Sequence, residues 1–502
     1  MQAARIIAVF CCSAIAGWAA SADARLIRAV QTQDQAQTRA LLDQKIDVNA
    51  PEGDGSTALH YAAYQDNLAI AQLLIQAGAR ADAANDLGAT PLHVACNNGS
   101  AAMVGLLLAA KANPNAKLLD GETVLMTCAR TGNAAAVKAL LAGGADPKAA
   151  EPEHHQTALM WAAAEKHSQV TALLIEFGAD VRARSRAYPM TVTPEQTQRA
   201  GREELNYDVM RGGSTPLLFA ARSGDAASAK ILLEHGADPN DSLPDGTSAL
   251  VLAAHSGNRE VALALLDKGA NPNDLGSGYT ALDAAILRSD PELVKALLAK
   301  GADPNLKMIK GTPTRRNSTD YNLLAPLIGA TPYLLAAKFL EPGIMKTLLA
   351  GGADPKIRMP NGATALMLAA GMNSANNEDR RGVNVIDYGK PEPESEVLPA
   401  LEVALDSGGD VNAVNNRGDT ALHAAVTHRY EAVIQLLASH GANVNARNRN
   451  GQTPLALVSG PPRNSESPTA STKAGAGSSG TAIADEPAAR RIAALLRTLG
   501  AN

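Results

Sequence analysis

Apolar and polar residues alternate along this chain in blocks that recur at a nearly fixed interval. Each block opens on a similar tetrapeptide: TALH at 57, TPLH at 90, TVLM at 123, TALM at 157, TPLL at 215, SALV at 248, TALD at 280, TPYL at 331, TALM at 364, TALH at 420 and TPLA at 453. Most intervals match the period of about 33 that is typical of stacked helical repeats, and three are clearly longer. The long intervals indicate insertions that leave the register intact.

Each block predicts a pair of helices. The leading Thr or Ser is a favoured N-cap, and proline suits the first helical position, as at Pro91, Pro216, Pro332 and Pro454. A second helix carries a Leu-Leu pair and ends at a glycine that keeps the same spacing from each cap: Gly78, Gly144, Gly178, Gly236, Gly269, Gly301, Gly352 and Gly441. Glycine takes the left-handed C-cap conformation cheaply, so Lys111, which replaces it once, predicts a weaker helix end.

The segment GSTALHYAAYQDNLAIAQLLIQAGARADAANDLGATPLHVACNNG resembles ankyrin repeats, and the match recurs along most of the chain. The resemblance implies an all-α fold: an elongated, curved ankyrin-repeat α-solenoid of about twelve helix-turn-helix-hairpin repeats, spanning roughly 100 Å. The small apolar residues that dominate the composition, with only 3% aromatics, suit many closely packed helices. The segment that starts at residue 25 is a degenerate first repeat, and EPAARRIAALLRTLGAN is expected to be the second helix of the last.

The N-terminal segment 1–24 is typical of a secretory signal peptide. Arg5 precedes an apolar run from Ile6 to about Ala20, and small residues follow, so we expect cleavage after Ala22 or Ala24. The apolar run is short for a membrane anchor, and the residues before Cys11 and Cys12 make a poor lipoprotein signal. We therefore predict a signal peptide at 1–24 and a repeat array at 25–502, exported to the periplasm or secreted, without stable membrane insertion.

Four insertions interrupt the array. Those at about 182–212 and 306–329 follow a second helix and precede the next cap, which places them in hairpin fingers, and both contain tyrosines and basic residues. They are either partner-contacting loops or neutral length variation. The insertion at 372–395 lies between a first and a second helix, with a strand-like core GVNVIDYG. The one at 461–485 has the same location and is rich in Ser, Gly, Thr and Pro, which predicts disorder.

The histidines and cysteines of the repeats are better explained by structure than by chemistry. His93 shares its repeat position with methionine, leucine, valine and aspartate, and the ankyrin resemblance implies that it braces the turn near the threonine. Cys96 and Cys128 occupy alanine positions, and we expect no disulfide between them because packed helices lie about 8–10 Å apart.

Three further features could suggest ligands, and each has a simpler interpretation. EPEHH at 151–155 carries two histidines that would point apart on an extended strand, and no third metal ligand is evident. The GADPN motifs, with Asp238 and Asp303, resemble calcium loops, but turn capping explains them better. Trp161 falls in a position that packs between repeats, so we expect it in the core. No motif of a phosphate loop, nucleophile elbow or metalloprotease is present.

The ankyrin resemblance implies a non-catalytic scaffold that binds a partner protein through hairpin tips and the concave first-helix face. Carried over to this chain, the family's contact positions are Tyr64, Gln65, Asn97, Asn98, Asp120, Glu122, Arg130, His154, Glu165, Arg222, His255, Tyr279, Arg288, Phe339, Arg417, Asp419 and His428. The net charge of −5 and pI near 6.1 give no basic footprint, so we expect no nucleic-acid partner. We also expect no cofactor, no metal and a monomer.

Two alternatives stay open. One is a secreted effector that binds a protein of another organism. The other is a metal-dependent enzyme that uses the inserted loops.

Overall fold

The computed structural model describes residues 24–192, 207–312, 323, 325–372, 393–459 and 486–502. The chain divides into two compact units, residues 1–186 and 187–502. The expected signal peptide, the strand-like core of the third insertion and the expected disordered segment lie outside the described residues. No helix within the described ranges combines the length and apolar character needed to cross a bilayer.

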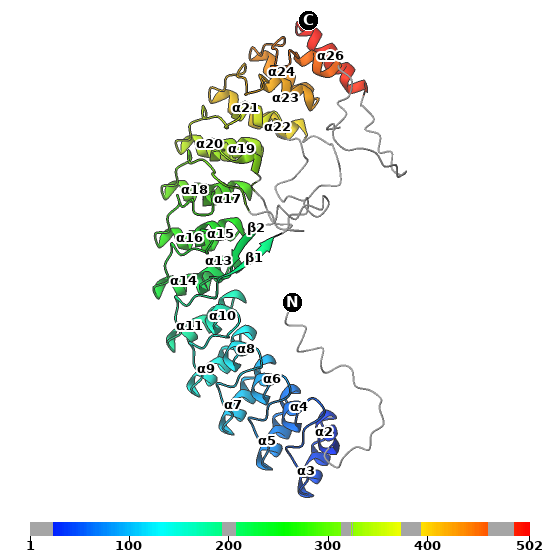
Figure 1. Ribbon diagram of the computed structural model, residues 1–502, viewed down its shortest axis with the longest axis vertical. Coiled ribbons are helices and arrows are strands. Elements are labelled where there is room, and N and C mark those ends of the chain that lie inside the picture. Colours follow the sequence, from blue (N-terminus) through cyan, green and yellow to red (C-terminus); the bar gives the residue numbers. More distant parts are fainter. Residues whose placement is uncertain (1–23, 193–206, 313–322, 324, 373–392, 460–485) are drawn as a thin grey trace. The chain divides into compact units, whose positions relative to one another are not determined.

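The first unit is a stack of helix pairs in chain order (Figure 1). Each pair consists of a first and a second helix that pack against each other and against the corresponding helices of the next pair. The pairs are α2 (Ala24–Gln31) with α3 (Gln35–Asp43), α4 (Ala58–Tyr64) with α5 (Leu68–Gln76), α6 (Pro91–Asn97) with α7 (Ala101–Ala109), α8 (Val124–Thr131) with α9 (Ala134–Ala142), and α10 (Ala158–Ala164) with α11 (Ser168–Glu176).

The second unit has the same organisation and begins with a two-stranded ribbon, β1 (Tyr188–Val192) and β2 (Tyr207–Arg211). Its helix pairs are α13 (Pro216–Ser223) with α14 (Ala226–Glu234), α15 (Ala249–His255) with α16 (Arg259–Asp267), α17 (Ala281–Leu287) with α18 (Pro291–Ala299), α19 (Pro332–Lys338) with α20 (Pro342–Ala350), α21 (Ala365–Ala369) with α22 (Glu394–Asp406), α23 (Ala421–Thr427) with α24 (Glu431–Ser439), and α25 (Pro454–Ser459) with α26 (Glu486–Thr498). A short 3-10 helix, η3 (Ala325–Leu327), precedes α19. The all-α solenoid of helix pairs predicted from the sequence is thus confirmed.

The predicted helix signals are visible at both ends of the helices. Thr215 and Thr331, for example, have extended backbones and cap α13 and α19, whose first residues are prolines. The glycine after a second helix is left-handed, with φ of 94° at Gly78. Lys111 takes the same conformation at φ 68°, where a Cβ is unfavourable, so the weaker helix end predicted there has a physical basis.

The cores of the two units are built from short side chains. Leucines such as Leu92 and Leu217 and alanines such as Ala95 and Ala220 are fully buried. The alanines occupy the same position of their repeats. Because the alanine side chain is a single methyl group, the first helices of adjacent repeats can approach closely there. The interior of each unit is therefore filled by the leucine and alanine side chains that recur at the same positions of each repeat.

The described part of the first insertion is an antiparallel ribbon. Tyr188 pairs with Arg211, and Val192 pairs with Tyr207. The ends of the second insertion pack onto the array, since Met308 and Leu323 are buried and the Met308 amide donates to the Ala330 carbonyl at 2.9 Å. The third insertion is shorter than predicted at its end, because α22 already begins at Glu394.

Candidate functional site

The recurrent histidines of the tetrapeptides are part of the scaffold. The Thr57 amide donates to His60 Nδ1 at 3.0 Å, which leaves the proton on Nε2, and Nε2 lies 2.9 Å from the Ala89 carbonyl of the next repeat. His93 and His423 accept from Thr90 and Thr420 in the same way, at 3.2 Å. These contacts match the predicted turn-bracing role.

Burial sets the protonation of these rings. Desolvation lowers the pKa of His60 and of His423, and it lowers the pKa of His93 to about 4. Near neutral pH the rings are therefore neutral, as acceptance of an amide hydrogen by Nδ1 requires.

Asp283 occupies the same repeat position without an imidazole. Its Oδ2 accepts from the Thr280 amide and hydroxyl, both at 2.9 Å, while its Oδ1 is buried without a hydrogen-bond partner among the described residues. Desolvation raises the pKa of this carboxyl to about 6. Like the histidines, it closes the turn rather than facing a substrate.

The expectation that the two cysteines stay unpaired is wrong. Cys96 in α6 and Cys128 in α8 form a disulfide, with a Cα–Cα distance of 4.6 Å. The separation of about 8–10 Å used for the prediction is measured between helix axes. Each Cα lies about 2.3 Å off its axis, so residues that face each other across two packed helices come several ångströms closer.

The EPEHH segment is a turn, so the expectation of an extended strand is also wrong. The Glu151 carboxylate accepts from the amides of Glu153, His154 and Gln156 at 2.8–2.9 Å. His155 has φ 54° at the position that glycine fills in other repeats, and its Nε2 lies 2.8 Å from a guanidinium nitrogen of Arg186. Glu151 thus stabilises the turn by accepting its amide hydrogens, and the His155 side chain contacts Arg186 and not His154.

The GADPN motifs are occupied by turn and inter-repeat hydrogen bonds. Asp303 Oδ1 accepts from the Asn305 amide at 2.8 Å, which is the capping role expected. Asn305 then reaches the next repeat, where Oδ1 accepts from the Asp354 amide at 2.8 Å and Nδ2 donates to the Gly352 carbonyl at 3.0 Å. Within the described ranges, no three His, Cys, Asp or Glu side chains are grouped as metal ligands would be.

The predicted contact residues lie on the first-helix face, defined here by the ends of the first helices and the hairpin tips before the caps. Several of its predicted contact residues also tie adjacent repeats together. Asn98 Nδ2 donates to the Tyr64 carbonyl at 2.7 Å, Gln65 Nε2 donates to the Gln31 carbonyl at 2.7 Å, and Arg288 Nε donates to the His255 carbonyl at 2.6 Å. His428 Nε2 lies 2.9 Å from the Gly371 carbonyl, and burial lowers the pKa of His428. These side chains present only part of their surface to a partner.

The first unit places Glu122 and Arg130 of this face in one cluster with Trp161 and Thr127. Arg130 lies over the Trp161 ring, 5.5 Å from its centre, and pairs with Glu122 at 3.4 Å. Glu122 also accepts from the Thr127 hydroxyl at 2.8 Å. Trp161 is half-buried rather than in the core as expected, and its indole nitrogen has no hydrogen-bond partner among the described residues. The cluster holds an aromatic ring and an arginine, the residue types that dominate binding energies, in a fixed arrangement.

The other predicted contact residues differ in exposure. Five of them are exposed: Tyr64, Asp120, Glu165, Arg222 and Arg417. Another five are half-buried: Asn97, His154, His255, Phe339 and Asp419. Tyr279 is only 4% exposed, and its ring lies 5.9 Å from that of His255. It supports the face from beneath and offers a partner little surface.

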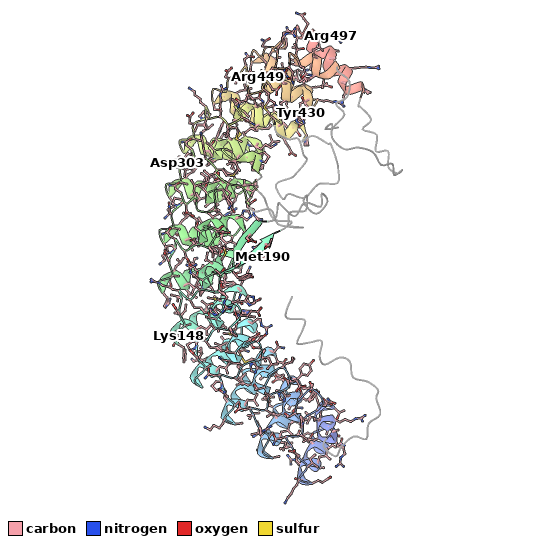
Figure 2. The ribbon with its side chains drawn as sticks, viewed as in Figure 1. Lys148, Met190, Asp303, Tyr430, Arg449 and Arg497 are labelled. Atoms are coloured by element: carbon pink, nitrogen blue, oxygen red, sulfur yellow. A yellow bond between two sulfur atoms is a disulfide. The ribbon has the colours of Figure 1, made fainter. Side chains whose placement is uncertain are left out.

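The repeat pattern did not predict the exposed apolar group on the ribbon. Tyr188, Met190 and Met210 are between 37% and 41% exposed. Figure 2 shows Met190 on the side of the second unit that carries the first helices. The sequence signal for this group was the apolar character of YPMTV and YDVM inside an otherwise polar insertion.

Comparisons with known proteins agree with this architecture. A family model described as ankyrin repeats (3 copies) matches residues 26–118, 103–185, 217–308 and 394–459, more than half of the chain. The NF-kappa-B inhibitor alpha of Homo sapiens is 34% identical over 117 residues, which cover 23% of this chain and 32% of that protein.

Two poxvirus proteins give similar matches. Ankyrin repeat protein 14 of Vaccinia virus is 34% identical over 70 residues (14% of this chain, 30% of that protein). The ankyrin repeat domain-containing protein OPG023 of Cowpox virus is 32% identical over 87 residues (17% of this chain, 12% of that protein). The matched segments thus span a third or less of these relatives. The chain belongs to the ankyrin repeat family.

Proposed function

We propose that this chain is a non-catalytic scaffold that binds a partner protein through its first-helix face. Ankyrin repeats are generally protein–protein interaction modules, and the family is generally non-catalytic. The observation that supports the proposal is that structural side chains and variable surface side chains occupy different positions of the repeat. The histidines and the cysteines of the repeats are committed to caps and a disulfide, whereas residues at the ends of the first helices vary from repeat to repeat.

In the first unit, the binding surface is the Glu122–Arg130–Trp161 cluster with its exposed neighbours. Tyr64 is 46% exposed and Glu165 is exposed, and these two side chains extend the same row of first helices. The ion pair and the cation–π contact hold the Arg130 side chain in one arrangement, so a partner has less side-chain entropy to immobilise when it binds. Tyrosine and tryptophan then supply contact area.

The proposal includes a location outside the cytoplasm. Residues 1–24 have the pattern of a secretory signal, and a cut after Ala22 would leave α2, which begins at Ala24, intact. The Cys96–Cys128 disulfide supports the same compartment, because disulfides persist where glutathione and thioredoxin do not keep thiols reduced. A periplasmic partner and a protein of another organism are both compatible with this location.

Photocrosslinking in the producing cell tests the proposal. A photoreactive amino acid at position 64 should capture a partner that mass spectrometry identifies. The capture should be lost with Glu165→Arg and kept with the matched variant Lys138→Glu, since Lys138 is exposed on the second helix α9. Equal capture by both variants, or none from position 64, would contradict the proposal. Recovery from periplasm or medium distinguishes the two locations.

A further inference from the structure

Asparagine side chains connect the repeats at the edge formed by the turns after the second helices. Each accepts a backbone amide hydrogen of the next repeat with Oδ1 and donates to a backbone carbonyl there with Nδ2, at distances of 2.7–3.1 Å. We call this set the asparagine ladder: Asn49, Asn115, Asn273, Asn305, Asn412 and Asn445.

The ladder is interrupted at Lys356. By its place in the repeat, this residue corresponds to Asn305, and the backbone groups it would meet are the Asp410 amide and the Gly408 carbonyl. A lysine has no acceptor for an amide hydrogen. No described residue accepts from the Asp410 amide.

A cavity of about 230 Å³ lies at this interruption. Its wall includes Lys356, Gly408 and Asp410, together with Arg358 and the buried ring of Tyr333. The cavity is therefore lined by the two residues whose backbone groups correspond to those that asparagine satisfies in other repeats.

Two departures from the repeat pattern accompany the cavity. Gly409 stands where most other turns carry alanine, and a Cβ there would lie 2.6 Å from the Ala404 carbonyl oxygen, so this turn has a backbone conformation that alanine does not fit. Tyr333 stands where the other tetrapeptides have leucine, and its hydroxyl lies 2.9 Å from Ser407 Oγ.

We propose that this pocket binds a primary carboxamide, the side-chain group of asparagine or glutamine. The carboxamide oxygen accepts from the Asp410 amide and its nitrogen donates to the Gly408 carbonyl, as the ladder asparagines do elsewhere in the chain. Lys356 and Arg358 at the rim favour a ligand that carries a negative charge or a carbonyl beside the amide. The Asp410 carboxylate is engaged by the Asn412 amide at 2.9 Å, as the Asp354 carboxylate is by the Lys356 amide.

The probe is N-acetyl-L-asparagine, titrated into the full chain with the Asp410 amide followed by NMR. We expect a saturable shift with this probe and none with N-acetyl-L-alanine. Lys356→Asn supplies the missing carboxamide from the chain itself, so it should raise the melting temperature and weaken probe binding by at least about tenfold. The matched control Lys148→Asn fills another interruption of the ladder and should leave probe binding unchanged.

Two results would overturn the proposal: equal shifts with the alanine derivative, or unchanged probe binding by the Lys356→Asn variant. A further arm separates the two sources of the carboxamide. Binding of L-asparagine as well as of the acylated form assigns a free amino acid, whereas binding of the acylated form alone assigns a residue within a polypeptide. The pocket lies between the turns after α20 and α22 and the beginning of α21, and none of the predicted contact residues of the first-helix face lines it, so its test is independent of that face.

Discussion

Cys96 and Cys128 covalently join two neighbouring first helices at the centre of the first unit. Both side chains are fully buried and 32 residues apart in sequence. A bridge over a loop of this length stabilises mainly by restricting the unfolded chain, by about 3–4 kcal/mol in the loop-entropy model. It connects consecutive repeats, which otherwise contact each other only through nearest-neighbour packing.

We expect the double variant Cys96→Ala/Cys128→Ala to melt at a lower temperature than the oxidised protein. Alanine fits both positions, because it fills them in other repeats, so the loss comes from the bridge and not from packing. Thermal unfolding with and without reductant measures it. The oxidised protein should also resist alkylation until it is reduced and unfolded. If reductant left the melting temperature of the wild-type protein unchanged, the stabilising role of the bridge would be excluded.

Thr90→Ala should destabilise its repeat by about 1 kcal/mol, because the cap and its contact with His93 are lost together. The Thr90 hydroxyl lies 3.0 Å from His93 Nδ1, and Thr90 is 4% exposed. Arg222→Ala, at an exposed residue, should leave stability unchanged. Urea unfolding of the three proteins compares them. If neither variant changed the unfolding free energy, the assignment of caps and surface positions would be contradicted.

The sequence predicted the repeats well because capping and core positions follow simple steric and hydrogen-bonding rules. The period located the caps at Thr90 and Thr215, and the variety at the His93 position indicated a structural role. Features that depend on distances between repeats were harder to predict from the sequence. The disulfide was missed because axis separation was used in place of Cα separation.

The repeat pattern also did not predict the local conformation of residues that depart from the pattern. His155 adopts a left-handed backbone at a glycine position, a conformation that is uncommon for residues with a Cβ. Trp161 was expected in the core, but this repeat position is only half-buried, as it is at Val94 and Leu252, and the ring lies against Arg130. The recurrent GADPN motif carried a signal for the asparagine ladder, but its partners only became visible in three dimensions.

The contribution of His93 to stability should fall as the pH is lowered from about 6.5 towards 4, because His93 has a lowered pKa. In the folded state the pKa of His93 is about 4, whereas in the unfolded chain it is near its ordinary value of 6.5. Between these values the unfolded state binds the extra proton, so acid favours unfolding, by up to about 3 kcal/mol for this one group. His60 and His423 act in the same direction.

The variant His93→Met isolates this contribution, because methionine fills the same repeat position at Met126 and Met160. We expect its unfolding free energy, measured by urea between about pH 4.5 and 7.5, to depend less steeply on pH than that of the wild type. Parallel curves for the two proteins would show that His93 does not carry the dependence.

Asp283 should act in the opposite direction from the histidines. Its pKa is raised in the folded state from 3.8 to about 6, so the folded state binds the extra proton between these values. Its contribution to stability is therefore present at low pH and is lost as the pH rises through about 6. At neutral pH the buried carboxylate costs up to about 3 kcal/mol relative to its protonated form.

Asp283→Asn should therefore raise the unfolding free energy at about pH 7.5 and have little effect at about pH 4.5. Asparagine is neutral and keeps an oxygen that can accept from the Thr280 amide. Urea titrations at the two pH values measure the difference. The control is Asp238→Asn, since Asp238 is exposed in a turn and asparagine fills the same position at Asn271. If Asp283→Asn destabilised the protein at the higher pH, the ionised carboxylate would have to be a net stabilising cap.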